Sequence, residues 1–413
     1  MTFTIPRLSL TLGAALFAPL SQALLAQDTI EERLDKLEKE NKELRNQMDA
    51  VSGELEIFEF RDIIPKVGES VSGLGPAASK VYQKESGLSI GGYGEMVYTD
   101  YSGSKTSTAD FVRNVLYIGY KFDDKWVFNS EIEVEHADEI FLEFAYLEYM
   151  HNDAFNFRTG MLLMPMGLHN EMHEPTTYRG PGRPETERRI IPSTWRENGL
   201  GVLGDVGDFS YKFYIVNGMD ASGFDEKGLR GGRQKGSKAL AEDLAAVARF
   251  DWNSDFGLFA GFSAYYGDSG QEQAGYASSG TTIYDLHAQY SVGALRLRGL
   301  YAMSDLEDAD AISMTNGNKV ASEMDGWYLE AGYDIASAIN PDSTHSVIPF
   351  VRYEEINTQA KMPAGLTADP FYDEKITTMG IDWKPIANIV LKAAYLDYDN
   401  DDDSMQLSMG YVF

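Results

Sequence analysis

Apolar and polar side chains alternate from about residue 87 to residue 413, and this period of two is the strongest pattern in the chain. In the segment "KWVFNSEIEVEH", apolar residues occupy even-numbered positions and polar residues occupy odd-numbered ones. The apolar residues are Trp126, Phe128, Ile132 and Val134, and the polar residues are Asn129, Glu131, Glu133 and Glu135. Successive residues of a strand point to opposite faces, so each such segment predicts a strand with one apolar and one polar face. Segments of about ten residues repeated in this way are typical of transmembrane strands.

The connections between these segments alternate in length. Short ones lie near residues 123, 152, 207, 254, 292 and 385. Longer ones span 165–198, 218–241, 268–281, 304–324 and 357–373, and 336–345 is long for its class. Outer-membrane barrels join their strands by tight periplasmic turns and longer extracellular loops. We therefore predict an all-β transmembrane barrel of about 16 antiparallel strands over 87–413, an even number that leaves both ends of the barrel in the periplasm.

Aromatic residues gather beside the short connections, where an interfacial girdle belongs. They are Phe122, Trp126, Phe155, Phe209, Trp252, Phe256, Trp383 and Phe413. The last segment ends in "GYVF", with Tyr411 two residues before Phe413. This ending resembles the signal by which outer-membrane barrels are recognised for assembly, so we expect Tyr411 and Phe413 to serve in insertion.

A different period precedes the strands, since residues 28–60 carry apolar positions at alternating steps of four and three. The seam positions are Ile30, Leu34, Leu37, Asn41, Leu44, Met48, Val51, Leu55 and Phe58, all apolar except Asn41. The heptad spacing and the charged residues between them predict an α-helical coiled coil, in which Asn41 on the seam fixes the register. One amphipathic helix lying against the barrel is the alternative. Pro65 and a Gly, Ser and Ala-rich stretch then predict a linker over 61–86.

Residues 1–26 have the pattern of a secretory signal peptide. Arg7 precedes the apolar run "LSLTLGAALFAPL", and the small residues Ser21, Ala23 and Ala26 offer cleavage positions. The run is too short to span a bilayer as a helix, and no later apolar stretch approaches the roughly 20 residues that a spanning helix needs. We therefore expect an exported protein.

Composition narrows the candidate functions. The chain has 39 Gly, 24 Tyr and 21 Phe, which suits alternating strands with two different faces. It has no Cys, which removes disulfides and thiolate metal sites. The formal net charge of −29 argues against nucleic-acid binding, which needs clustered Lys and Arg. We expect no cofactor and no metal, although the two imidazoles of "HNEMHE" (169–174) and the acidic tip 397–403 leave a cation open.

The chain resembles the phosphate-selective porin O/P family, most densely at "FAYLEYM…FNFRTGMLLMPMGLHNEMHEP" (144–175) and "RRIIPSTWRENGLGVLG" (188–204). The resemblance implies a trimeric, 16-stranded diffusion channel of the outer membrane for small hydrophilic solutes, either general or anion-preferring. It also implies contact with outer-membrane lipid and lipopolysaccharide. In such porins a long outer loop folds into the barrel and narrows it, and the matching segment here is 165–198.

The candidate pore residues follow from this loop and from the parity of the strands. The loop supplies a constriction set of Arg179, Arg183, Arg188, Arg189, Arg196 and Glu187. The strands supply a lining set of Arg113, Arg158, Lys212, Arg249, Arg296, Arg298, Glu131, Glu133 and Glu135. Guanidinium groups in a narrow throat attract phosphate or carboxylate. Arg–Glu pairs that only brace the loop against the wall are the alternative, and the acidic row at 131–135 departs from the uniformly basic path of a phosphate-specific member.

Two other classes of protein compete with a channel. An outer-membrane hydrolase needs a nucleophile beside a base, and Asp285 and His287 share one face without a Ser motif to partner them. A structural tether would combine an occluded barrel with a periplasmic coiled coil. Current across a planar bilayer distinguishes a channel from a tether.

Overall fold

The computed structural model describes residues 30–57 and 70–413, and within the first range it describes side chains for residues 33–48. The chain divides into two units, Met1–Glu59 and Phe60–Phe413. The predicted signal peptide, 1–26, lies outside the described residues.

Helix α1 (Ile30–Ile57) occupies the region of the heptad pattern. Leu34, Leu37, Leu44 and Met48 on its seam are each more than half exposed, as is expected of a coiled-coil strand described without its partners. Asn41 lies on the same helix and is also exposed. Pairing of this helix with other copies stays a prediction. No helix within the described ranges combines the length and the apolar character that a membrane span requires.

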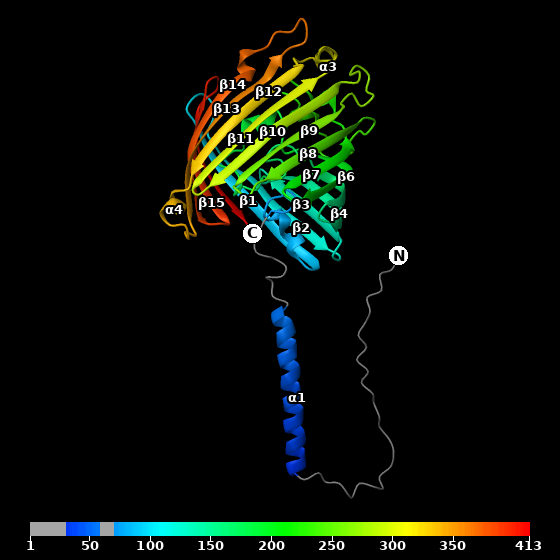
Figure 1. Cartoon of the computed structure of the whole chain (residues 1–413), viewed down its shortest axis with the longest axis vertical. Coiled ribbons are helices and arrows are strands. Elements are labelled where there is room, and N and C mark those ends of the chain that lie inside the picture. The colour runs from blue at the N-terminus through cyan, green and yellow to red at the C-terminus, as the bar shows by residue number, and fades with distance from the viewer. Residues whose placement is uncertain (1–29, 58–69) are drawn as a thin grey trace. The chain divides into compact units, whose positions relative to one another are not determined.

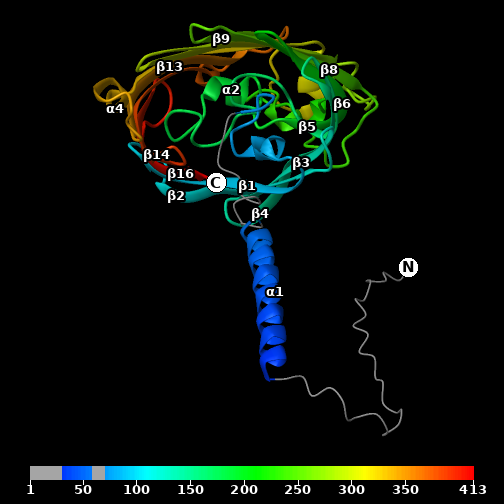
Figure 2. The ribbon, with the colours of Figure 1, turned by 60° about the horizontal axis from the view of Figure 1, so that its bottom comes forward.

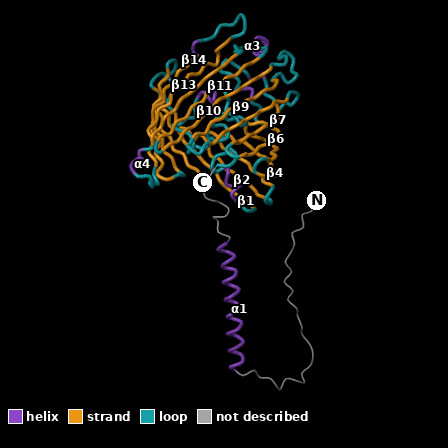
Figure 3. Tube along the Cα trace, in the orientation of Figure 1, coloured by secondary structure: helices purple, strands orange, loops and turns teal. Residues whose placement is uncertain are grey.

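The second unit is a closed barrel of 16 antiparallel strands (Figures 1 and 3), which confirms the predicted fold class and strand number. Each strand pairs with its neighbours in sequence, and β1 pairs with β16 to close the barrel. The strands are β1 (Gly87–Tyr101), β2 (Thr108–Lys121), β3 (Trp126–Glu135), β4 (Glu139–Asn152), β5 (Phe155–Leu163), β6 (Arg196–Val206), β7 (Phe209–Asn217), β8 (Leu244–Asn253), β9 (Leu258–Asp268), β10 (Gly280–Val292), β11 (Leu295–Leu306), β12 (Glu323–Tyr333), β13 (Ser346–Lys361), β14 (Asp373–Ile386), β15 (Ile389–Tyr398) and β16 (Ser404–Val412).

Burial follows the sequence parity along these strands. On β16, Met405, Leu407 and Met409 are exposed on the outer face, while Gly410 is buried. On β3, Glu131 and Glu133 are buried inside the barrel and Trp126 is exposed outside. Large apolar side chains on the outer face and polar ones on the inner face are the arrangement of a barrel surrounded by lipid.

The connections have the predicted asymmetry, and they define two ends of the barrel. At the turn end, strands are joined by two to four residues, except at 334–345, which contains α4 (Ile335–Ile339). The loop end carries the long links, with α2 (Glu185–Arg189), η3 (Ala221–Gly223), η4 (Arg230–Gly232), α3 (Ala309–Asn316) and η5 (Pro370–Tyr372). The predicted aromatic girdle lies at the turn end, where Phe122, Phe209 and Phe256 are exposed. There the Phe413 N–H donates to Gly92 O at 2.9 Å and helps close the seam.

The described part of the expected linker, 70–86, packs inside the barrel (Figure 2). It contains η2 (Ala78–Gln83), which contacts β1, β2 and β3. Leu74, Ala77, Ala78 and Val81 are each only 1% exposed. Glycine and small residues serve close packing here as readily as they serve flexibility, which is why composition alone favoured a linker.

Candidate pore and the segments that fill it

Residues 164–195, between β5 and β6, fold into the lumen and contact the wall on several sides (Figure 2). Glu171 pairs with Lys212 on β7, and the Gly167 N–H donates to Asp285 on β10 at 3.0 Å. On the far side, Lys392 of β15 donates to Gly180 O at 2.8 Å. A loop held by opposite walls crosses the lumen, and we call it the constriction loop.

Two polar side chains hold the constriction loop together. The Asn170 amide nitrogen donates to Met164 O at 2.7 Å, and its oxygen accepts from the Trp195 N–H at 2.7 Å, which ties the two ends of the loop. Glu187 accepts from the backbone N–H groups of Leu168 and His169 at 2.9 and 2.8 Å. It also accepts from Tyr328 on β12 at 2.7 Å, so Glu187 joins the loop to the wall.

The protonation of Glu187 and His169 follows from these contacts. Burial opposes ionisation of Glu187, but His169 and the hydrogen bonds lower its pKa to about 2. Burial lowers the pKa of His169 as well. Its Nδ1 lies 2.6 Å from Glu187 and its Nε2 lies 2.8 Å from a nitrogen of Arg298, so a neutral imidazole donates to the carboxylate and accepts from the guanidinium. Glu187 therefore carries a charge that the loop itself satisfies.

Most arginines of the predicted constriction set are paired with carboxylates. Arg196 lies 2.6 Å from Glu143, and Arg179 lies 3.6 Å from Glu330. Arg188 and Arg189 both pair with Glu185, and Arg189 also reaches Glu374 on β14. Arg183 differs, because its buried Nη1 has no hydrogen-bond partner among the described residues. The Arg179–Glu330 pair braces the loop against the wall, the Arg196–Glu143 pair joins β6 to β4, and Arg188 and Arg189 line the cavity at the loop end.

The predicted lining set faces the lumen, but most of it does not border open space. Its buried members pair with acidic neighbours: Arg113 with Glu95 at 2.7 Å, Arg158 with Glu148 at 2.7 Å, Lys212 with Glu171 at 2.5 Å and Arg249 with Asp251 at 2.7 Å. Glu131 and Glu133 are covered as well, whereas Glu135, Arg296 and Arg298 are half-buried. The expected basic track is thus neutralised along much of the wall, because the constriction loop covers these side chains and buried charges require partners.

Sequence reasoning missed the acidic partners of these pairs and two further basic residues. The missed residues are Glu95, Glu148, Asp251, Glu330, Arg352 and Lys392. Each lies on the inward parity of its strand, so the strand pattern contained the signal. Their pairing partners are not visible in the sequence, since ion pairs such as Arg179–Glu330 join distant segments.

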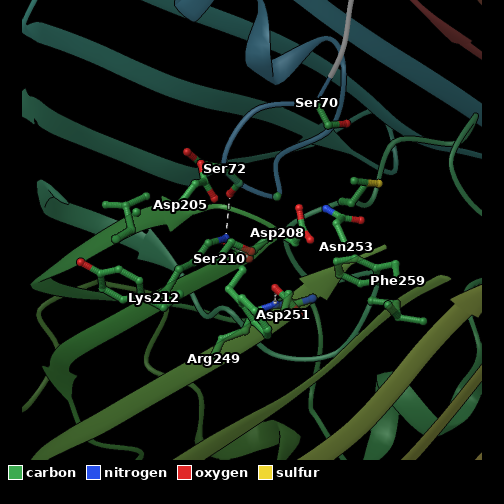
Figure 4. Close-up of a pocket in the computed structure, with 18 of the residues that line it drawn as sticks. Ser70, Ser72, Asp205, Asp208, Ser210, Lys212, Arg249, Asp251, Asn253 and Phe259 are labelled. Carbon is green, nitrogen blue, oxygen red and sulfur yellow. Dashed lines mark hydrogen bonds and ion pairs between the residues drawn. The ribbon is translucent and has the colours of Figure 1, made fainter. Parts of the chain in front are cut away.

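A cavity of about 520 Å³ opens at the turn end, on the side of β5 to β10 (Figure 4). Ser70 and Ser72, from the segment 70–86, border one side of the cavity. Lys212, Arg249 and Asp251 of the strands border the other side. Lys212 donates to Ser72 O at 2.7 Å. Lys212 and Arg249 are paired with Glu171 and Asp251, and Asp205 and Asp208 also line the cavity, so its lining carries more acidic than basic side chains.

A second cavity of about 520 Å³ lies at the loop end and is strongly basic. Its charged lining consists of Arg188, Arg189, Lys227, Arg230, Arg233 and Lys235 with Asp225, Glu374 and Asp401. Burial and the neighbouring arginines lower the pKa of Arg230 to about 9, and burial and Arg196 lower that of Arg233 to about 10. Guanidinium groups stay protonated at neutral pH, so these shifts reflect burial first and crowding of like charges second. Four members, at positions 227, 230, 233 and 235, come from the loop 218–243, which sequence reasoning did not assign to the pore.

The geometry around His287 does not form a hydrolase site. Ser263 donates to Asp285, not to His287. His287 Nδ1 lies 2.6 Å from Asp285 and its Nε2 lies 2.8 Å from Asp251, so both ring nitrogens are engaged. A nucleophile needs direct contact with its base. Within the described ranges, no group of three or more His, Asp or Glu side chains is arranged to hold a metal ion.

The closed 16-stranded barrel with an inward loop has the porin fold, and solved structures share it. The chain matches OmpF of Salmonella typhi with a TM-score of 0.54 and 14% identity, covering 80% of this chain and 98% of that one. It matches an anion-selective porin from Comamonas acidovorans with a TM-score of 0.51 and 13% identity, covering 80% of this chain and 100% of that one. It matches a loop-deletion mutant of OmpT, an outer membrane protein of Vibrio cholerae, with a TM-score of 0.52 and 11% identity. This match covers 80% of this chain and 100% of that chain. At these identities the likeness shows the fold, which fits an outer-membrane location.

The chain belongs to the same family as a protein of Aquifex aeolicus (strain VF5) described as "Uncharacterized protein". The two are 35% identical over 376 residues, covering 85% of this chain and 86% of that protein. No family model matches the chain, so membership of the phosphate-selective porin O/P family is not confirmed.

Proposed function

We propose that this protein is an outer-membrane channel through which small hydrophilic solutes diffuse, and that its loop-end mouth favours anions. The porin fold supports the channel. The crowding of arginines around the loop-end cavity, in a chain of net charge −29, supports the preference. The sequence resembles the phosphate-selective porin O/P family, and phosphate is one anion that paired guanidiniums recognise well.

The observation that carries the anion preference is that Arg230 and Arg233 lack an ion pair among the described residues while bases outnumber acids around the cavity. Among the described residues, neither guanidinium lies within ion-pair distance of a carboxylate, and Arg230 instead donates to Arg188 O at 3.3 Å. Arg233 donates to the backbone oxygens of Pro192 and Thr194. A passing anion would relieve the repulsion between these groups, and a passing cation would increase it.

We further propose a homotrimer with the coiled coil in the periplasm. One solved neighbour, OmpT of Vibrio cholerae, is described as a trimer form, with a TM-score of 0.51 and 11% identity. The exposed seam of α1 supplies a second surface for association, and Asn41 would set its register. Tyr411 and Phe413 would serve in assembly, since they lie at the seam that closes the barrel.

The test is the reversal potential of the full-length protein in a planar bilayer under a salt gradient. The wild-type channel should prefer anions, and R230A/R233A should lower the anion-to-cation permeability ratio about threefold. Lys238→Ala is the matched control, because Lys238 is an exposed base of the same loop that does not line the cavity. A cation-selective wild type, or an equal shift in the control, would contradict the anion preference. Inhibition of chloride current by phosphate would identify phosphate as a preferred solute.

A non-conducting barrel that serves as a structural tether is the second candidate. The lumen favours it in one respect, since the constriction loop and residues 70–86 fill much of the barrel. Absence of current at all voltages, from protein shown to be folded, would favour the tether.

A further inference from the structure

The segment 70–86, here called the lumen segment, is built into the wall of β1, β2 and β3. The Asn129 amide on β3 donates to Ala78 O at 2.9 Å. Ala77, Ala78 and Val81 are buried against this wall. Backbone polar groups inside a protein need partners, and for Ala78 O a side chain of the barrel wall supplies one.

Two glycines of the wall leave room for the lumen segment. A Cβ placed at Gly119 on β2 would lie 2.6 Å from the Cβ of Val81. A Cβ placed at Gly91 on β1 would lie 2.9 Å from Ala77 O. Any side chain at either position would push the segment away, so the inner face of these strands is shaped to receive it.

A tyrosine fixes the far end of the lumen segment to the next strands. Tyr82 donates to Glu148 on β4 at 2.8 Å and lies 2.8 Å from the hydroxyl of Tyr146. Arg158 on β5 donates to the Tyr82 hydroxyl at 3.3 Å. The segment therefore takes part in a polar network with side chains of β4 and β5.

The lumen segment also contacts the constriction loop directly. Glu174 of that loop accepts from the backbone N–H groups of Ala77 and Ala78 at 2.8 and 3.0 Å. A Cβ at Gly75 would lie 2.4 Å from the carboxyl carbon of Glu174, so Gly75 is required for this approach. On the other side, Lys212 joins Ser72 O to Glu171 of the loop. The lumen segment thus binds Glu174 of the constriction loop directly and is connected to Glu171 through Lys212.

We propose that the lumen segment forms one wall of the pore, closing the β1–β4 side of the turn-end half and positioning the constriction loop through Glu174. Solutes then leave by the cavity beside β5 to β10, which Ser70, Ser72 and Gly73 of the same segment border (Figure 4). The lumen segment would thereby set the pore width, a property that the strand count does not determine. This inference rests on the proposed channel function.

The direct test replaces residues 70–83 by a Gly/Ser sequence of equal length in the full chain. Because the wall side of the lumen is then vacated, the single-channel conductance should rise at least about twofold. The matched control makes the same replacement at 336–342, in the long link at the same end of the barrel, where Ile339 is exposed. The control should keep the wild-type conductance. Equal conductance of the 70–83 variant and the wild type would overturn the proposal.

Glu174 supplies a second variant in case the replacement prevents folding. Glu174→Gln keeps an oxygen that accepts from Ala77 and Ala78 and should keep the wild-type conductance, whereas Glu174→Ala removes it and should raise the conductance. Identical conductance of Glu174→Ala and Glu174→Gln would contradict the positioning role.

Thiol labelling separates this inference from the channel function, since it needs no current. The chain has no Cys, so Asn129→Cys gives a single thiol beneath the lumen segment. A small membrane-impermeant maleimide should label it slowly in the full chain and rapidly in the 70–83 variant. Equal rapid labelling in both would overturn the placement of the segment, even if the channel conducts. Slow labelling together with absence of current in every variant would support the placement and contradict the channel.

Discussion

Basic side chains are paired with carboxylates in the middle of the lumen, whereas two of them lack such a pair at its loop-end mouth. In the middle, Arg113, Arg158 and Arg249 are buried and each has a carboxylate within 2.7 Å. At the mouth, Arg230 and Arg233 crowd other arginines, and among the described residues no carboxylate pairs with them. A fully buried charge without a partner costs several kcal/mol, whereas a half-buried charge at an open cavity keeps part of its hydration and can lack an ion pair. Selectivity is therefore expected to reside at the mouth, and stability in the middle.

The largest effect is expected where a middle pair is broken. Glu148→Ala leaves the Arg158 guanidinium buried without its carboxylate and removes an acceptor from Tyr82. It should lower the free energy of unfolding by about 3–5 kcal/mol. Urea titration of the barrel in detergent micelles measures this change. Replacing both partners, as E148L/R158M, should cost less than the single change. A single-variant cost below about 1 kcal/mol would show that water reaches this pair.

A smaller, pH-dependent effect is expected at Glu174, between the two regions. Burial raises its pKa from 4.5 to about 7, against the hydrogen bonds from Ala78 and Ala77, with Glu131 and Lys80 nearby. A raised pKa means that the folded barrel binds more protons than the unfolded chain between pH 4.5 and 7. The contribution of Glu174 to stability is therefore present below that window and falls as pH rises through it.

The lumen segment should accordingly be held more firmly at pH 6 than at pH 8. Labelling of Asn129→Cys, corrected for thiol ionisation with an exposed cysteine, should be about two- to threefold slower at the lower pH. Glu174→Gln in the same background should remove the difference. A difference that persists in Glu174→Gln would assign the effect to another group, such as Lys80.

A weak effect on stability is expected from breaking a pair at the mouth. The Arg188 side chain is 46% exposed although it lies 2.6 Å from Glu185. Arg188→Ala should therefore lower the free energy of unfolding by no more than about 1 kcal/mol, since exposed pairs contribute little. Comparison with Glu148→Ala in the same urea titration gives the contrast between the two regions. A loss of unfolding free energy similar to that of Glu148→Ala would contradict the contrast between the two regions.

The smallest effect is expected when a middle pair is neutralised as a unit. R249Q/D251N removes one positive and one negative charge that lie 2.7 Å apart, so the field along the path changes little. The reversal potential should stay at the wild-type value, while R230A/R233A moves it toward cations. A shift of equal size in the two double variants would place selectivity in the middle of the lumen.

The strand pattern alone predicted the barrel, because a period of two with lipid on one side is a local property of the chain. Alternation in segments such as 126–135, together with the unequal connections, gave 16 strands and the two ends. The resemblance of 144–204 to known porins indicated which loop folds inward, and the contacts of Glu171 and Gly180 place it there. The sequence also placed the inward-facing charges, since parity decides the side of the sheet.

Only the tertiary structure decided which of those charges are neutralised and which remain. Lys212 and Glu171 are 41 residues apart, and Arg179 and Glu330 are farther still, so no local pattern pairs them. The four basic residues of 218–243 reach the mouth only because their loop folds over α2 and the constriction loop. The lumen segment has the composition of a linker, yet Gly75, Gly91 and Gly119 give it close contacts inside the barrel. The composition of a segment shows that it could be a flexible linker. Whether the segment packs inside the barrel depends on the space that residues distant in sequence leave for it.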